Sequence, residues 1–153
     1  MARPTLEIIL GLRETADRMG DGAPYAWGHH GSCNCGHLVQ TITHESPGKI
    51  QALAVEKLGD WSDKFIAYCP TSQFPIDHVI TQMLEVGFTT DDLYALERLC
   101  DRDVLAMIPE HRKPLRHNRR EDAMVYMRAW ADLLEAQLMG VVEEERVCVE
   151  IKF

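Results

Sequence analysis

Hydrophobic residues recur every three or four positions along most of the chain, a spacing that places them on one face of an α-helix. The clearest amphipathic stretches cover residues 5–19, 76–86 and 119–139. Shorter stretches of the same kind lie at residues 34–44, 47–58, 61–68, 91–99 and 101–108. The pattern therefore predicts a mainly α-helical protein.

Residues that begin or end helices separate these stretches. Thr5 and Ser46 have side chains that cap helix N-termini, and Pro47 suits a first helical position. Gly20 follows an apolar stretch and favours a helix end. Because the connections are short and 153 residues suffice for one hydrophobic core, we expect a compact, bundle-like, multi-helix single domain over residues 1–153.

The end of the chain departs from the helical pattern. From residue 146 onward polar and apolar residues alternate, with Val147, Val149, Ile151 and Phe153 on one side. A period of two predicts a short β-strand. The rest of the chain offers no partner strand. We therefore expect residues 141–153 to be either a tail or a strand that pairs with a second copy, which would make the protein a homo-oligomer.

The charge and hydropathy of the chain narrow the classes of partner. A formal net charge of −8 and a pI of about 5.3 argue against binding to nucleic acid, which requires a basic surface. The sequence has no long apolar run and no signal peptide, so we expect a cytoplasmic protein that does not contact a membrane. The odd number of cysteines, five, favours free thiols or ligands over a disulfide framework.

Residues 24–40 carry the densest chemistry in the chain. Five residues that can bind a transition metal lie close together here: His29, His30, Cys33, Cys35 and His37. Zinc prefers thiolate and imidazole ligands, and copper and iron also accept them. Only one residue separates the two cysteines, whereas structural zinc sites mostly have roughly two to four between paired cysteines. The stretch predicts a site for zinc, another transition metal or a small ligand, completed by a distant residue.

Cys35 is also a candidate catalytic nucleophile. Ser32 or Asn34 can cap a helix that begins here, which places Cys35 in its first turn. The positive end of the helix dipole lowers the pKa of a thiol in that position and favours the reactive thiolate. A general base would come from elsewhere in the chain, and the candidates are His78, His111 and His117.

Part of this stretch resembles a known enzyme family. Residues 24–28, Pro-Tyr-Ala-Trp-Gly, and residues 35–40, Cys-Gly-His-Leu-Val-Gln, are similar to the nucleophile segment of the papain-like NlpC/P60 cell-wall peptidases. The resemblance implies that Cys35 is the nucleophile of a cysteine hydrolase. It covers 17 of the 153 residues, and Asn34 stands where that family has Asp. The family continues into a β-sheet that carries its catalytic histidine, whereas helices are predicted here.

A basic stretch offers a second candidate for ligand binding. Residues 112–120 are rich in Arg and Lys in a chain that is otherwise acidic. Arg116 and His117, together with the indole of Trp27, are candidate contacts for a small or anionic ligand. A solvated run of charges explains the same residues without a function.

A purely structural interpretation also exists for the cysteines, because Cys is among the most often buried residue types. The sequence therefore leaves three functional hypotheses open. The first is a metal or small-ligand site at residues 29–37, and the second is a hydrolase that uses Cys35. The third is a non-enzymatic, homo-oligomeric scaffold.

Overall fold

The computed structural model describes residues 1–151, including the side chains of all but residues 142, 143, 150 and 151. These residues form α-helices, one short 3-10 helix and connecting loops, without a strand. In chain order they are α1 (Leu6–Gly20), α2 (Asn34–Thr43), α3 (Pro47–Ala54), α4 (Trp61–Ile66), α5 (Pro75–Val86), α6 (Thr90–Arg98), α7 (Arg102–Ala106), η1 (Glu110–Arg112) and α8 (Arg120–Ile151). The predicted mainly α, compact multi-helix domain is confirmed.

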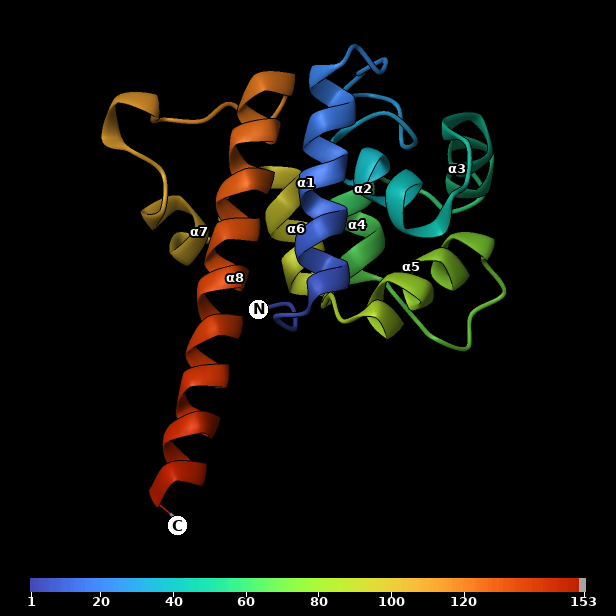
Figure 1. Ribbon diagram of the computed structural model, residues 1–153. Helices are drawn as coiled ribbons and strands as arrows, with labels where there is room; N and C mark the ends of the chain where they lie inside the picture. The colour runs from blue at the N-terminus through green and yellow to red at the C-terminus, as the bar shows by residue number, and fades with distance from the viewer. Residues whose placement is uncertain (152–153) are drawn as a thin grey trace.

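Helices α1 and α8 lie side by side and run in opposite directions, and the other helices flank this pair (Figure 1). Arg13 of α1 reaches Asp132 and Glu135 of α8 at 2.8 and 2.9 Å. Arg128 of α8 reaches Asp17 of α1 at 3.1 Å. Exposed ion pairs such as these contribute little free energy individually. They accompany a buried apolar contact between the two helices, which holds the pair together.

Helix α2 lies at the centre of the molecule. It contacts α1, α3, α5 and α6, and residues 31–39 are all buried. Two tryptophans belong to the hydrophobic core: Trp61 of α4 stacks on Phe65 with ring centroids 5.3 Å apart, and Trp130 of α8 meets Phe88 edge-on at 5.6 Å. The second half of the chemically dense stretch, residues 31–39, is therefore part of the interior, whereas residues 24–30 are exposed or partly buried.

The helix caps expected at Thr5 and Ser46 are present. The hydroxyl of Thr5 accepts a hydrogen bond from the backbone N–H of Ile8, and that of Ser46 accepts one from Lys49. Gly20 is the last residue of α1. Each such cap satisfies an amide that has no partner within its own helix and adds about 1 kcal/mol to stability.

The predicted C-terminal strand is wrong over residues 147–151, which belong to α8, and residues 152–153 lie outside the described part of the chain. Helix α8 passes through Gly140 because extending an existing helix costs far less than starting one, and a glycine adds only about 1 kcal/mol. Pairing through a strand therefore loses its basis, whereas homo-oligomerisation itself stays a prediction. No described helix, α8 included, is both long and apolar enough to span a membrane.

Candidate ligand pocket at the start of helix α2

The loop before α2 folds back tightly over the first turn of that helix. A Cβ atom at Gly36 would lie 2.3 Å from the carbonyl oxygen of His30, and one at Gly31 would lie 2.0 Å from that of Pro47. Neither position has room for any side chain, because real Cβ atoms do not approach other atoms so closely. Gly36 therefore allows the loop backbone to touch the start of α2, and Gly31 allows the loop to touch the start of α3.

Asn34 joins three segments of the chain at this point. Its side-chain nitrogen lies within hydrogen-bonding distance of the carbonyl oxygens of Leu96, Glu97 and His117, at 3.3, 3.1 and 2.8 Å. Its side-chain oxygen accepts a hydrogen bond from the hydroxyl of Tyr25 at 2.8 Å. Asn34 therefore fixes the loop, the end of α6 and the segment before α8 around the start of α2. It does not cap that helix.

A carboxylate from another helix takes the capping role. The N-cap residue of α2 is Cys33, whose side chain makes no capping bond, so the prediction of a cap at Ser32 or Asn34 is wrong. Instead, Oε2 of Glu97, from α6, accepts a hydrogen bond from the backbone N–H of Cys35 at 3.1 Å. The Cys33 thiol donates to the same oxygen at 3.6 Å. A negative group here also suits the positive end of the α2 dipole.

The two thiols at the helix start do not become thiolates easily. Cys35 is fully buried, and its thiol donates to the carbonyl oxygen of Leu93 at 3.1 Å. Burial, followed by the nearby Glu97 carboxylate, raises the pKa of both Cys33 and Cys35 well above the usual range. The lowered pKa expected for Cys35 is therefore wrong, because these two effects outweigh the helix dipole. Catalysis by Cys35 stays a prediction.

The three histidines of the stretch point to separate partners. Nδ1 of His29 accepts a hydrogen bond from the N–H of Gly31 at 3.1 Å. The ring of His30 lies between Gln51 and the carbonyl oxygen of Gly59, at 3.2 and 3.3 Å. Nε2 of His37 donates to the carbonyl oxygen of Pro24 at 2.9 Å. Across residues 1–151, no three His, Cys, Asp or Glu side chains are grouped to hold a metal ion, so metal binding stays a prediction.

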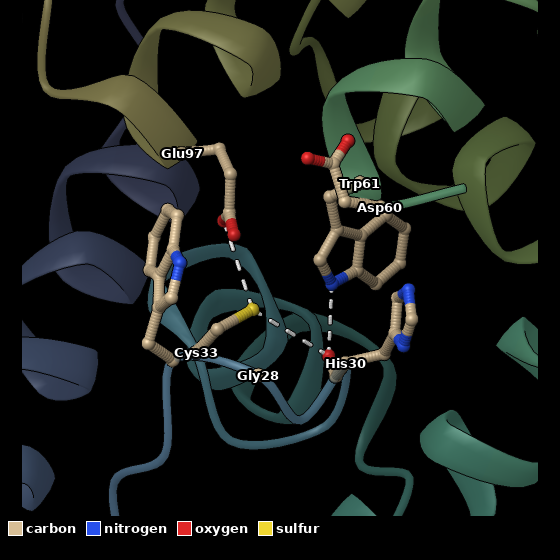
Figure 2. A pocket seen from close by; sticks show the side chains of 7 residues that line it. Gly28, His30, Cys33, Asp60, Trp61 and Glu97 are labelled. Atoms are coloured by element: carbon tan, nitrogen blue, oxygen red, sulfur yellow. Dashed lines mark hydrogen bonds between the residues drawn. The ribbon is translucent and has the colours of Figure 1, made fainter. Parts of the chain in front are cut away.

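A pocket of about 110 Å³ opens beside this helix start. Its lining comes from the loop, from α4 with its cap, and from α6: Trp27, Gly28, His30, Cys33, Asp60, Trp61 and Glu97. Figure 2 shows the Glu97 carboxylate directed toward Cys33, with Trp61 on the opposite side. The indole N–H of Trp61 donates to the carbonyl oxygen of His30 at 2.9 Å, which fixes the ring against the loop.

The carboxylate of Glu97 is only partly satisfied by the protein. Both of its hydrogen bonds fall on Oε2, and Oε1 meets no donor and no cation among the described side chains. The residue is 4% exposed, and burial raises the pKa of its carboxyl group although the bonds from Cys35 and Cys33 oppose that shift. The pocket wall thus carries a carboxylate with one oxygen bound to the protein and the other without a protein donor.

Two of the other predicted ligand contacts meet at this pocket. The ring of His117 packs against that of Trp27 with centroids 4.7 Å apart, and Trp27 lines the pocket. The distant histidine that approaches the motif is therefore His117. His78, His111 and Arg116 are exposed and lie outside the lining of this pocket.

Sequence reasoning missed Glu97, Asp60 and Trp61 as pocket residues. Glu97 does leave a trace in the sequence, because it follows Leu93 by four positions and so shares the buried face of α6. A carboxylate among apolar residues on a buried helix face is a sign that it has a specific partner in the interior. Asp60 and Trp61 leave no such trace.

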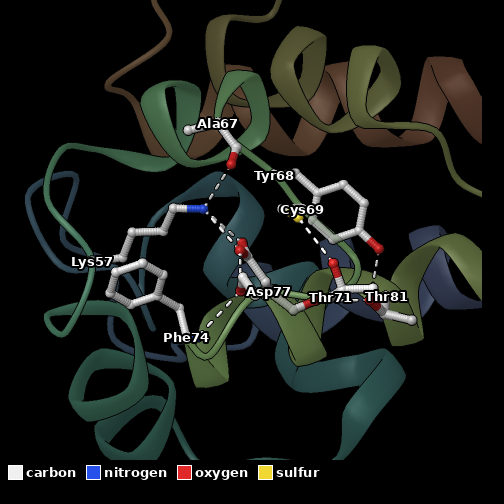
Figure 3. A network of polar contacts seen from close by, with 9 residues as sticks. Lys57, Ala67, Tyr68, Cys69, Thr71, Phe74, Asp77 and Thr81 are labelled. Carbon is white, nitrogen blue, oxygen red and sulfur yellow. Dashed lines mark hydrogen bonds and ion pairs between the residues drawn. The ribbon is translucent and has the colours of Figure 1, made fainter.

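A second polar cluster lies apart from the pocket and is fully satisfied by protein groups. Nζ of Lys57 lies 2.9 Å from both carboxylate oxygens of Asp77 and donates to the carbonyl oxygen of Ala67 (Figure 3). Asp77 is completely buried and also accepts a hydrogen bond from Ser72 at 2.6 Å. Because its charged groups are paired within it, this cluster acts as a clasp that joins the loop after α3 to the end of α4 and the start of α5.

Comparison with known proteins finds no relative of this chain. No protein-family model matches the sequence, and neither the curated proteins nor the solved structures contain a significant match. The function of the chain therefore has to be argued from its own geometry.

Proposed function

We propose that this protein binds a small molecule in the pocket beside the start of α2. The observation that carries the proposal is the free Oε1 atom of Glu97, a carboxylate oxygen without a protein donor, on a residue that is 4% exposed and lines a pocket of about 110 Å³. A buried charge costs free energy unless it is paired or hydrogen-bonded. A ligand that supplies the missing partner offsets this cost, and such a ligand binds selectively.

The pocket has the composition of a binding site. Its walls combine the two indoles of Trp27 and Trp61 with a few polar groups that come from different elements. Ligand sites in proteins have this mixture of apolar surface and a small number of placed polar groups. The raised pKa of the Cys33 thiol keeps it protonated, which favours a role in binding over a nucleophilic role.

The three tryptophans of the chain provide a direct test with an internal control. The indole N–H signals of Trp27 and Trp61 report on the pocket, whereas Trp130 lies in the core with its Nε1 against Met1. In ¹⁵N-correlated NMR spectra, a library of small molecules of different charge should contain members that shift Trp27 and Trp61 and leave Trp130 unchanged. A library in which no member shifts either pocket signal would contradict the proposal.

A further inference from the structure

The charges around the pocket point to one class of ligand. We propose that the ligand is a compact organic cation with a methylated ammonium group, held between Trp27, Trp61 and Glu97. This inference rests on the proposed function, since it names the chemistry that the same pocket recognises. Three features of the lining support it: the charges, the aromatic surfaces, and the small number of free acceptors.

The charged groups of the lining are acidic. Glu97 and Asp60 are the carboxylates, and no Lys or Arg belongs to the lining. Burial, with the nearby Lys64 as a second cause, lowers the pKa of His30 and favours its neutral form. Arg98 already pairs with Asp60 at 3.3 Å. Glu97 is therefore the carboxylate left without a counter-charge, and a cationic ligand supplies one.

The aromatic side chains of the lining also favour a cation. An indole face attracts cations more strongly than any other side-chain ring, and the attraction increases where water is excluded. Phe65 stacks on Trp61 with ring centroids 5.3 Å apart, and His117 packs against Trp27 at 4.7 Å. Both indoles are therefore held in place before any ligand arrives, which reduces the entropy lost on binding.

The hydrogen-bonding capacity of the pocket favours a methylated ammonium over a primary one. A primary ammonium has three N–H donors and requires an acceptor for each when it is buried. Oε1 of Glu97 is a free acceptor here, and the nearby carbonyl oxygen of His30 already binds the indole of Trp61. A quaternary ammonium needs no acceptors, because its charge is spread over methyl groups that contact rings and carboxylate directly.

The test compares a cation with its neutral isostere. Choline and 3,3-dimethylbutan-1-ol have the same shape and differ in the positive charge, and tetramethylammonium carries the cationic head alone. In titrations followed by the indole signals of Trp27 and Trp61, choline and tetramethylammonium should bind at least about tenfold more tightly than the alcohol. Equal affinity for choline and the alcohol would overturn the inference and leave the proposed small-molecule site intact.

Variants separate the role of the charge from that of the fold. Glu97→Gln keeps the size of the side chain and an oxygen for the N–H of Cys35, and it should reduce the preference for choline over the alcohol to within about threefold. Glu56→Gln, at an exposed position outside the pocket, is the matched control and should keep the full preference. If Glu97→Gln does not fold, Trp27→Leu takes its place, because Trp27 is only half-buried and its replacement disturbs the fold less. Trp27→Leu should lower the affinity for choline at least about tenfold. Unchanged choline affinity in the variant used would contradict the inference.

Discussion

Oε2 of Glu97 accepts the backbone N–H of Cys35 at 3.1 Å, so a carboxylate of α6 caps helix α2 through an amide that lies 62 residues earlier in the chain. The same contact brings the negative charge to the positive end of α2, where the helix dipole partly stabilises it. The capping group and the wall of the pocket are therefore one side chain. Its second oxygen remains available to a ligand because the first is committed to the helix.

Removing this cap should destabilise the protein. Glu97→Leu leaves the N–H of Cys35 buried without an acceptor, which costs about 1–3 kcal/mol in the free energy of unfolding. Glu97→Gln retains an oxygen at that position and should cost less. Urea unfolding measures both values, and Glu56→Gln, at an exposed site, serves as the control. A loss for Glu97→Leu no larger than that for Glu56→Gln would show that the cap does not matter.

The buried thiols should make stability fall at alkaline pH. Their pKa is raised in the folded state, so above about pH 8.5 the unfolded chain releases these protons first and unfolding becomes more favourable. The measurement is the slope of unfolding free energy against pH, between pH 8 and pH 10 in reductant, for the wild type and for the double variant Cys33→Ala/Cys35→Ala. Tyr126 and Lys64, whose pKa shifts do not depend on these thiols, titrate in both proteins and cancel in the difference. Identical slopes would contradict the prediction.

Thiol reagents should divide the five cysteines into two groups. Cys69, Cys100 and Cys148 are exposed, whereas Cys33 and Cys35 are buried. A disulfide reagent such as DTNB should therefore modify three thiols rapidly and the other two only as fast as the protein opens. Cys69 should react first, because hydrogen bonds from Thr71 lower its pKa and stabilise the thiolate. Rapid reaction at Cys35, detected by mass spectrometry, would contradict this division and support the hypothesis that Cys35 is a nucleophile.

Removing only one charge of the Lys57–Asp77 pair should strongly lower the free energy of unfolding. Lys57→Met leaves the completely buried Asp77 without its cation and should lower the free energy of unfolding by about 3–5 kcal/mol. The double variant Lys57→Met/Asp77→Asn removes both charges and should recover part of that loss. Lys49→Met breaks the exposed pair with Glu45 and should cost less than about 0.5 kcal/mol. Thermal and urea unfolding compare the three proteins, and equal losses for the two single variants would rule out a special role for the clasp.

Glycine at position 36 should be indispensable, in contrast to Gly48. Gly36→Ala puts a methyl group 2.3 Å from the carbonyl oxygen of His30, so the loop must move away from α2, at a cost of at least about 1–3 kcal/mol. Gly48 lies in α3 with open space around its Cα, and Gly48→Ala should stabilise the protein by about 0.5–1 kcal/mol. Circular dichroism melts measure both changes. If the two alanines have the same effect, close packing at the start of α2 is not important.

The sequence predicts the helices well because helix formation depends on neighbours three and four positions away. The apolar spacing of α1 and the caps at Thr5 and Ser46 are local signals, and the structure contains all of them. The strand expected near Val147 fails because its alternating pattern is also compatible with continuing a helix that already exists. Local signals cannot decide between these two outcomes.

The pocket is less predictable than the helices, since its walls come from residues up to 70 positions apart, between Trp27 and Glu97. The sequence identified Trp27, His30 and Cys33 through their density. It also identified His117, which packs against Trp27. It gave no basis for placing Glu97 next to them. Burial, with this carboxylate as the second cause, raises the pKa of the thiols, whereas the sequence predicted a lowered pKa for Cys35. The ionisation of these thiols therefore depends on how residues far apart in the sequence come together in the fold.

The position of Asn34 also determines when this pocket can form during folding. Its amide contacts Leu96 and Glu97, 62 and 63 residues away, and His117, 83 residues away. Closing such long loops is slow and entropically unfavourable until other contacts have already brought the ends together. The helices can therefore assemble early, whereas the junction around Asn34 forms late in folding. We therefore expect the pocket at the start of α2 to be among the last parts of the native structure to form.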